Sequence, residues 1–285
     1  MIRGLYTSAS GMTTQIKKQD TIANNIANIN TNGFKKSETI MTQGKEFDLY
    51  RKEDKKNEFI KEISPESKLT KIGKLGTGVK LSENFVSHSQ GLLKKTDEPL
   101  DFAIEGKGFF AFHTDNGIRY SRSGNLSLNQ EGYVVNSNGD FLLANNFQGD
   151  LAYVKVHGNF EILANGEIKG ADLDVNAENL EKLNGIVVNL TEVNQMKNSI
   201  LISEFDDVSK LNIEGDSYFY YDNQDEIVLS DKNKIYQGFL EGSNVNIVKE
   251  MVEMINVSRL YETNQKVLTS QDEVVAKTDE ISKWT

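Results

Sequence analysis

The two ends of this chain carry apolar residues at helical spacing, and a long glycine- and asparagine-rich interval separates them. Near the N-terminus apolar residues recur at alternating steps of four and three, as in a heptad seam, with the polar Gln19 as the one interruption. This N-terminal stripe comprises Leu5, Ala9, Met12, Ile16, Ala23 and Ile26. The C-terminal stripe is broader and comprises Val245, Val248, Val252, Ile255, Leu260, Val267, Val274 and Ile281. A helix with such a face is stabilised mainly by packing, so each needs a partner surface.

Two interpretations of that partner stay open from the residues alone. Both helices could pack on the central part of their own chain, or they could pack on each other and on neighbouring copies. An amide-rich face near the end of the first helix favours the second interpretation, because amides can bond to an adjacent subunit without net charge; it comprises Asn24, Asn25, Asn28 and Asn32. Asparagine also marks helix ends, and for Asn32 that simpler interpretation is preferred, since Gly33 can close a helix in the left-handed conformation.

Composition excludes several classes of protein. The net charge of −10 and the absence of a basic patch argue against a nucleic-acid partner. The chain has no cysteine, which excludes disulfides, thiolate metal sites and a cysteine nucleophile. No apolar run approaches the ~18 residues of a membrane span, and no signal peptide is evident. Ordinary rules then predict a cytoplasmic protein, although they miss export routes that use no cleaved signal.

The centre of the chain has a sequence pattern typical of antiparallel β-structure. Short apolar runs of strand length alternate with turn signals, of which three contain glycine in a hairpin context: Asp115-Asn116-Gly117, Gln130-Glu131-Gly132 and Asn138-Gly139-Asp140. The predicted strands are 100–104, 108–112, 117–121, 133–136, 141–144, 153–156, 161–163, 185–190, 199–205 and 218–221, with a short helical turn at 176–183. A charged stretch from Lys45 to Lys74 is expected to be an exposed arm or a plain solvated loop.

These patterns predict an α+β protein in four segments. An N-terminal helical segment covers 1–42, and a charged variable arm covers 43–75. A mainly antiparallel β-domain covers 76–238, and a C-terminal helix covers 239–285. The two helices are expected to pair as a coiled-coil-like layer.

No motif specifies catalysis, a cofactor or a metal. The glycine fingerprint at Gly106, Gly108 and Ala111 continues as a strand, so no helix N-terminus is expected there to receive a pyrophosphate. The calcium-loop pattern at Asp172 and Asp174 lacks its turn glycine and its bidentate glutamate. The histidines, His88, His113 and His157, share no ligand spacing. We therefore expect no enzyme activity and no cofactor.

Three blocks of the sequence carry a resemblance to bacterial flagellar rod and hook proteins. The first resembles the N-terminal signature of that family, the second the start of its β-domain, and the third its C-terminal helix. They comprise 1–12 with 22–35, 99–110 with 120–125, and 237–246 with 254–255 and 259–264. The blocks keep the family's order and span most of the chain. Gly242 stands where the family commonly has serine, and the 43–75 arm lies where rod and hook subunits differ.

The resemblance implies a non-enzymatic subunit of the flagellar basal body that polymerises helically through its terminal helices. In such proteins these helices form the innermost layer, and export occurs through the flagellar secretion channel, which explains a missing signal peptide. The implied partners are further copies, other rod and hook subunits and the export apparatus. The chain resembles rod proteins more than hook proteins, which usually carry a larger outer domain. A hook or other hook-basal-body protein is the alternative within the family, and an extracellular β-rich glycan-binding or glycan-cleaving protein is the alternative outside it.

Overall fold

The computed structural model describes residues 2–50, 71–146, 150–175, 198–205, 207–215, 217–221, 227–229 and 233–282. The chain divides into two compact units. The first, here called the helix unit, comprises Met1–Asn24, Glu38–Phe85 and Val248–Thr285. The second, the β unit, comprises Asn25–Ser37 and Val86–Ile247. Both units are therefore assembled from segments that lie far apart in the sequence.

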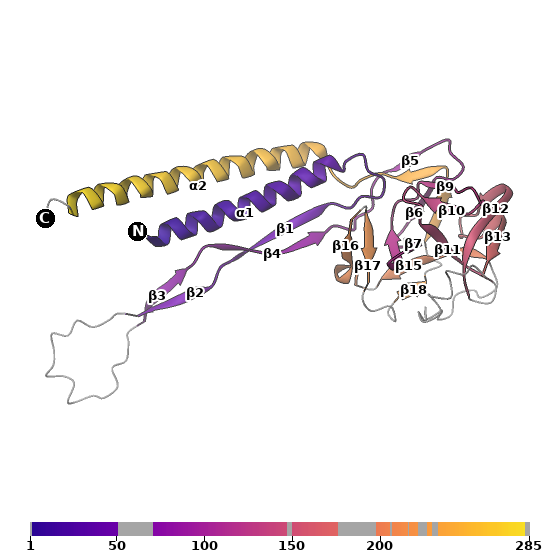
Figure 1. Cartoon of the computed structure of the whole chain (residues 1–285), viewed down its shortest axis with the longest axis horizontal. Coiled ribbons are helices and arrows are strands. Elements are labelled where there is room, and N and C mark those ends of the chain that lie inside the picture. Colours follow the sequence, from indigo (N-terminus) through magenta and orange to yellow (C-terminus); the bar gives the residue numbers. More distant parts are fainter. Residues whose placement is uncertain are drawn as a thin grey trace, which may run out of the picture. The chain divides into compact units, whose positions relative to one another are not determined.

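Two long helices run side by side in the helix unit (Figure 1). Helix α1 is Ile2–Ala27, and helix α2 is Ile247–Ser282. They are antiparallel, because Gly4 of α1 lies against Gln271 of α2 while Gly11 lies against Asn264. The predicted terminal helices that flank a mainly antiparallel β-structure are confirmed. Neither helix of the described chain is long and apolar enough to cross a membrane.

The ends of the helices differ from the sequence-based prediction. Helix α1 ends at Ala27 rather than near Asn32, because the chain turns at once: the Thr31 amide donates to the Asn28 carbonyl. Asparagine side chains compete with helical backbone hydrogen bonds, which accounts for the early end. Gly33 does adopt the predicted left-handed conformation, with φ of 71°, but at the end of this turn segment. Helix α2 begins at Ile247, so Val245 precedes it.

The helix unit also contains a two-stranded ribbon beside α1 (Figure 1). Strand β1 (Ser37–Gln43) pairs with β4 (Val79–Val86), and β2 (Glu46–Tyr50) pairs antiparallel with β3 (Lys71–Gly76). The Thr21 and Thr39 hydroxyls are 2.9 Å apart, and the Val79 amide donates to Ser10 Oγ at 3.3 Å. Both ends of the predicted charged arm are thus strands, whereas its middle lies outside the described residues.

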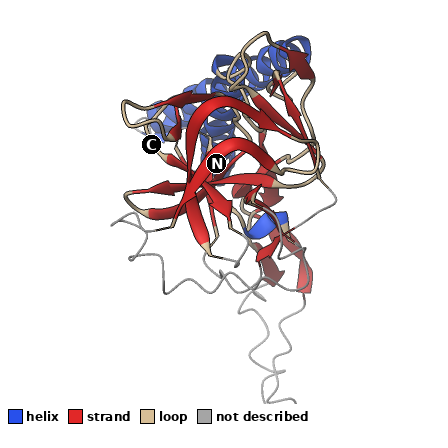
Figure 2. Cartoon of the chain, turned by 90° about the vertical axis from the view of Figure 1, so that its right-hand side faces the viewer, coloured by secondary structure: helices blue, strands red, loops and turns tan. Residues whose placement is uncertain are grey.

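The β unit is built around one large antiparallel sheet (Figure 2). Along its main path the strand order is β13-β12-β11-β7-β8-β17-β16, with β9, β10, β14, β15 and β18 attached beside it. Two further pairs, β5 with β20 and β6 with β19, complete the described strands of the unit. The bounds are β5 Leu93–Lys95, β6 Phe102–Glu105, β7 Phe109–Thr114, β8 Gly117–Ser121, β9 Leu126–Leu128, β10 Val134–Asn136, β11 Phe141–Asn145, β12 Leu151–Ile162, β13 Ile168–Asp174, β14 Ser199–Ile200, β15 Ile202–Phe205, β16 Asn212–Glu214, β17 Tyr218–Tyr220, β18 Ile227–Leu229, β19 Lys234–Gln237 and β20 Phe239–Glu241, with a 3-10 turn η3 at Val208–Lys210.

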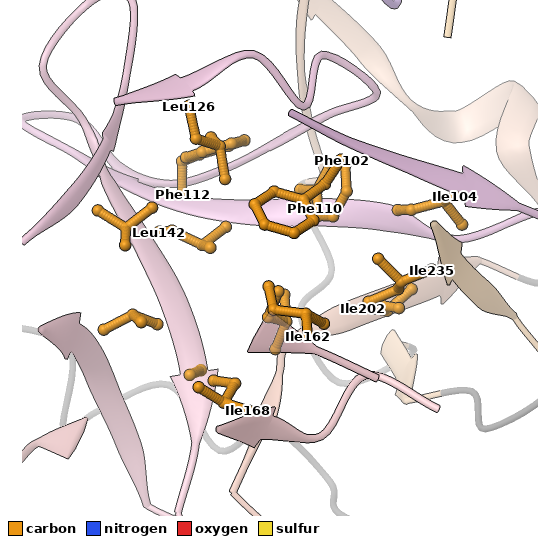
Figure 3. Close-up of a cluster of buried hydrophobic side chains, with 14 of the residues drawn as sticks. Phe102, Ile104, Phe110, Phe112, Leu126, Leu142, Ile162, Ile168, Ile202 and Ile235 are labelled. Atoms are coloured by element: carbon orange, nitrogen blue, oxygen red, sulfur yellow. The ribbon is translucent and has the colours of Figure 1, made fainter. Parts of the chain in front are cut away.

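Strand β7 shows why this sheet has a core on both faces. Successive side chains of a strand point to opposite faces. Phe109 and Ala111 belong to one buried apolar cluster, and Phe110 and Phe112 belong to the other. All four side chains are fully buried. Figure 3 shows the second cluster, in which Phe110 and Phe112 lie among Phe102, Leu126 and Leu142.

The predicted hairpin turns are confirmed by their backbone. Gly117, Gly132 and Gly139 have φ of 98°, 87° and 91°, which an L side chain rarely adopts. In the first turn Thr114 pairs directly with Gly117, so Asp115 and Asn116 form the two-residue loop between β7 and β8. The predicted strand at 185–190 and the predicted helical turn at 176–183 lie outside the described residues.

Candidate assembly surfaces and a buried ionic joint

The C-terminal stripe is exposed along α2. Its described helical members, Val248, Val252, Ile255, Leu260, Val267 and Val274, are between 42% and 67% exposed. Val245 is buried and lies before the helix, and the side chain of Ile281 lies outside the described residues. Large aliphatic side chains left this open along one helix form an exposed apolar surface, a feature typical of interaction sites.

These exposed residues form two strips rather than one. At about 100° per residue, Val248, Val252 and Ile255 project within an arc of about 60°. On the same reckoning Leu260, Val267 and Val274 project roughly 80° further around the helix. The helix therefore presents one apolar strip along its first part and another along its second, and each strip faces a different direction.

The N-terminal stripe is half exposed on α1. Ala9, Ile16 and Ala23 face solvent, with Ile16 46% exposed, whereas Leu5, Met12 and Ile26 are partly buried. The first three project within an arc of about 40°, so they form a continuous outward strip. Sequence analysis placed this stripe correctly on one side of a helix, but most of it is not the side that contacts α2.

Small and polar residues make the contact between α1 and α2. Gly4 lies against Gln271, Gly11 lies against Asn264, and Lys18 Nζ is 2.5 Å from Glu253 Oε1. The face of α1 that bears Gly4, Gly11 and Lys18 is turned about 100° from the N-terminal stripe. Ile22, which is 3% exposed, projects in the same direction as Gly4 and is the large apolar residue of this face. One apolar residue does not make a periodic stripe, so the seven-residue spacing of Gly4 and Gly11 is the signal that was available.

The asparagine face expected to bind neighbouring subunits is only partly available. Asn25 is 1% exposed, and its side chain is used within the chain. Its Nδ2 donates to the Ser37 carbonyl at 2.8 Å, and its Oδ1 accepts from the Ser37 amide at 3.0 Å. This pair of bonds fixes the segment that leaves α1. Asn24 is exposed, whereas Asn28 lies in the turn after the helix.

A buried ionic cluster, here called the joint, lies in the β unit and comprises Lys35, Arg122 and Glu241. Lys35 Nζ is 2.6 Å from Glu241 Oε1, and Arg122 Nη1 is 3.2 Å from Glu241 Oε2. The three side chains are 1%, 2% and 0% exposed. One carboxylate thus neutralises two cations away from water, an arrangement that is stable only when further hydrogen bonds satisfy the charged groups.

Backbone groups supply most of those further bonds, although Arg122 Nε is buried without a partner in the described structure. Lys35 Nζ donates to the Ser89 carbonyl at 2.9 Å, and Arg122 Nη2 donates to the Gly106 carbonyl at 2.6 Å. The Gly91 amide donates to Glu241 Oε1 at 2.8 Å. The Arg122 guanidinium also lies 4.9 Å from the centre of the Phe109 ring, a cation–π contact with the core of the sheet.

A histidine with a lowered pKa lies close to the joint. Burial, together with the charges of Lys35 and Arg122, lowers the pKa of His88 from 6.5 to about 4. The ring packs against Phe109 and Phe219, and its buried Nδ1 has no hydrogen-bond partner. Burial lowers the pKa of Lys35 and of Arg122 as well, and Glu241 opposes that shift in both. His88 is therefore neutral at pH 7 and does not add a third positive charge.

Neighbouring backbone contacts fix the same segments. Asn244 Oδ1 accepts from the Lys36 amide at 2.7 Å, and its Nδ2 donates to the Ser87 carbonyl at 2.8 Å. The Gly33 amide donates to the Glu241 carbonyl at 2.8 Å, and a β-carbon at Gly33 would lie 2.4 Å from the Ser123 nitrogen. Only glycine fits at that position. The segment after α1 and the segment before α2 are thus joined to each other and to the chain just before β5.

The joint unites the three blocks that carried the resemblance. Lys35 ends the first block, Arg122 lies in the second and Glu241 lies in the third. All three residues lie in the ranges that carried the resemblance, but the sequence pattern assigned them no role. The available signal was the presence of single charged residues within runs that otherwise pattern as buried strands and turns. The structure shows that these charges are buried and paired with one another.

The motifs that sequence analysis rejected lie on strands or next to them. Gly106 and Gly108 precede strand β7, as expected, and Gly108 packs against Asn233. Asp172 and Asp174 lie on strand β13. Among the described residues, no group of His, Asp and Glu side chains is arranged to hold a metal ion.

Comparison with known proteins gives the same three-block division. Residues 5–35 match the family model of flagella basal body rod proteins. Residues 103–204 match the flagellar hook protein FlgE/F/G D1 domain, and residues 236–281 match the C-terminal domain of flagellar basal body rod FlgEFG proteins. Each matched region supplies one residue of the joint. Lys35 lies in the first match, Arg122 in the D1 match and Glu241 in the C-terminal match.

Relatives match over nearly the whole chain. The flagellar basal-body rod protein FlgG of Buchnera aphidicola subsp. Baizongia pistaciae is 31% identical, over 97% of this chain and 98% of the relative. The FlgG protein of Borreliella burgdorferi is 30% identical, over 96% and 97%. The flagellar hook-basal body complex protein FlhO of Bacillus subtilis is 30% identical, over 99% and 100%. On these matches the chain belongs to the flagellar basal-body rod protein family.

Proposed function

We propose that the chain is a structural subunit of the flagellar rod and polymerises helically through α1 and α2 into the axial shaft that transmits torque. The observation that carries the proposal is the exposure of Val248, Val252 and Ile255 along one direction of α2. Each of these side chains is more than half exposed. Exposed apolar surface of this kind on a rigid helix is the usual mark of an interface.

The second strip on α2 and the outward strip on α1 extend the surface available for assembly. Because the strips face different directions, a neighbour on one strip leaves the others open for further neighbours. Contacts between unlike surfaces leave an unpaired surface on each copy, so they generate a ring when the rotation closes and a filament when it does not. A subunit with several such strips suits a helical shaft in which each copy contacts more than one neighbour.

The β1–β4 and β2–β3 ribbon supports the same proposal. A two-stranded ribbon is marginally stable alone, yet here it leaves Phe47 and Ile72 57% and 60% exposed. Lys71 pairs with Asp48, and Lys74 pairs with Glu46, but these exposed ion pairs contribute little stability. We propose that the 43–75 arm, whose described part forms the β2–β3 end of this ribbon, contacts neighbouring subunits in the rod.

The remaining features of the proposal follow from family membership. Partners would be further copies, other rod and hook subunits and the flagellar export apparatus. The subunit would act outside the cytoplasm, in the basal body, after passage through the flagellar secretion channel. The name of the Bacillus relative keeps another hook-basal-body protein as the alternative within the family. The exposed helical strips favour assembly over a glycan-binding role, and we assign no catalytic role.

Purification of hook-basal bodies tests the proposal directly. Detached hook-basal bodies from cells that express a tagged chain should contain it in the rod, and cells without it should lack completed flagella. Its absence from washed hook-basal bodies, with normal flagella in the deletion strain, would exclude a rod role. A position in the hook rather than in the rod, seen by labelling the tag, would select the alternative within the family.

A further inference from the structure

Helix α1 offers α2 two very different faces. The N-terminal stripe is apolar, and its members Ala9, Ile16 and Ala23 remain exposed. The face that α2 contacts bears Gly4, Gly11 and Lys18, and Ile22, 3% exposed, is the large apolar residue that projects with them. A ranking by hydrophobicity alone would place α2 on the stripe, because burial of apolar surface is the main attraction between amphipathic helices. Some feature of the second face must outweigh that preference.

Two matched contacts distinguish the second face. Gly4 and Gly11 are one heptad apart, and so are Asn264 and Gln271, so both pairs return to one face of their helix. A β-carbon at Gly4 would lie 2.5 Å from Gln271 Nε2, and one at Gly11 would lie 3.2 Å from Asn264 Nδ2. Each amide therefore occupies the space that a side chain on α1 would take. The Lys18–Glu253 ion pair continues the same face one heptad further along α1.

The polar character of this face has a cost. The side-chain oxygens of Gln15 and Gln271 are buried without a hydrogen-bond partner in the described structure. Buried and unpaired amide oxygens destabilise a contact. These groups therefore do not explain why α2 packs on this face of α1 rather than on the stripe. The glycines allow α2 to approach α1 closely. The stripe does not, because Leu5, Met12 and Ile16 carry bulky side chains there.

We propose that Gly4 and Gly11, with Gln271 and Asn264 seated over them, are specificity-determining contacts that direct α2 to the polar face of α1. They thereby keep the apolar stripe of α1 exposed for a second copy of this chain. The identity of that occupant rests on the proposed function. The choice of face within one chain does not rest on it, since all four residues belong to the same helix unit.

Cysteine cross-linking in the full chain measures the choice of face, because the natural sequence has no cysteine. Lys18→Cys with Glu253→Cys reports the polar face, where the native side chains meet at 2.5 Å. Ile16→Cys with Ile255→Cys reports apolar-face pairing, since both residues are exposed. Disulfides need closely spaced Cα atoms, so a short bismaleimide that spans the length of the replaced lysine and glutamate side chains is the cross-linker. In dilute protein it should join the first pair within one chain at least about tenfold faster than the second, the factor set by a preference of about 1.4 kcal/mol.

Filling the glycine positions should reverse this preference. In the Gly4→Leu/Gly11→Leu background, cross-linking of the 18–253 pair should fall by about fivefold or more, and cross-linking of the 16–255 pair should rise. Leucine is a better helix former than glycine, so loss of helix cannot explain the change. Asn264→Ala/Gln271→Ala removes the amides without blocking the face and should lower the 18–253 rate less. Thr13→Leu/Asp20→Leu, at exposed positions of α1, is the matched control and should leave both rates unchanged.

Two results would overturn the inference. One is an unchanged 18–253 rate after both glycines are replaced, and the other is failure of the 18–253 pair to cross-link in the otherwise natural chain. Intrachain cross-linking needs no polymer, so this test is separate from that of the proposed function. A chain that cross-links on the polar face but never enters rods would remove the proposed function and leave the choice of face intact.

Discussion

The β unit completes its own interior, whereas the helix unit does not. In the β unit both faces of β7 are covered by apolar clusters, and even the charged joint has its partners within the chain. In the helix unit α2 leaves Val248, Val252 and Ile255 more than half exposed, and the ribbon leaves Phe47 and Ile72 exposed. Comparable apolar residues are therefore used in opposite ways by two parts of one molecule.

The residues that stabilise the fold of the β unit are therefore different from the exposed residues proposed to mediate assembly. Residues that specify the β unit find their partners within the same chain, so their effects should appear in unfolding experiments on the isolated protein. The exposed strips of the helix unit contribute little to that equilibrium, because their side chains are solvated in both the folded and the unfolded chain. Their effects should appear when other subunits are present.

The largest expected effect is loss of assembly in Ile255→Asp. A carboxylate buried without a partner at a subunit interface costs several kcal/mol. The variant should fail to enter rods and leave cells non-motile, while the thermal transition of the β unit stays that of the natural protein. Soft-agar motility and differential scanning calorimetry provide the two measurements.

Gln265→Asp is the matched control, because it adds the same charge at an exposed position on the polar side of α2. Glu253→Gln would be less suitable as a control, because Glu253 pairs with Lys18. Normal motility of Ile255→Asp would show that this strip is not a packed interface. An altered β transition would show that the two units do not divide folding from assembly.

The next effect belongs to the β unit, where Glu241→Gln should lower the free energy of unfolding by about 3 to 5 kcal/mol. The substitution preserves side-chain shape but leaves Lys35 and Arg122 buried without a carboxylate. Urea denaturation of the full chain measures the change. Glu105→Gln is the control, because Glu105 is exposed and its contact is a single hydrogen bond from Tyr236.

Lys35→Met should destabilise less than Glu241→Gln, since it leaves the Arg122–Glu241 pair intact. A loss below about 1 kcal/mol in Glu241→Gln, as for an exposed ion pair, would show that the joint does not stabilise the β unit. Equal losses in Glu241→Gln and Glu105→Gln would lead to the same conclusion.

Two fragments sharpen the comparison further. The predicted β-domain, 76–238, should fold cooperatively, because it contains most of the apolar clusters, but it retains Arg122 without Lys35 or Glu241. The fragment 25–247 retains the whole joint. We expect 25–247 to be more stable than 76–238 by about 3 kcal/mol, the cost of leaving one buried charge unpaired. Thermal melts followed by circular dichroism would compare them, and equal stabilities would mean that the joint contributes nothing to the β core.

Sequence patterns predicted the β unit well because its signals are local. The turns at Gly117, Gly132 and Gly139 follow from the need for positive φ, and strand β8 has the predicted bounds, Gly117–Ser121. Alternation of apolar residues identified much of the sheet in the same way. What the pattern could not supply was the pairing of β7 with β15, a strand far along the chain.

For a related reason, sequence patterns could not predict the joint or the face of α1 on which α2 packs. Lys35, Arg122 and Glu241 meet only after three distant segments fold together, and nothing local marks them as partners. Hydrophobic periodicity identified the stripe on α1 but not its role, because the same period fits a surface that packs within the chain and one that packs between chains. The glycines of the contact face carry no hydrophobic signal.

The smallest expected effect is a loss of stability at acid pH through His88. Its folded pKa of about 4 lies below the ordinary 6.5, so the unfolded chain takes up a proton at higher pH than the folded chain does. The stabilising contribution of neutral His88 is therefore complete above pH 6.5 and is lost as the pH falls toward 4. Because the ring is only partly buried, we expect a loss of about 1 to 2 kcal/mol across that range.

His88→Phe keeps an aromatic ring between Phe109 and Phe219 but cannot be protonated, so it should remove this part of the pH dependence. Carboxylates that titrate in the same range affect both proteins equally, and the difference between the two urea-denaturation profiles isolates His88. Profiles that stay parallel from pH 7 to pH 4 would show that the cations of the joint do not act on this ring.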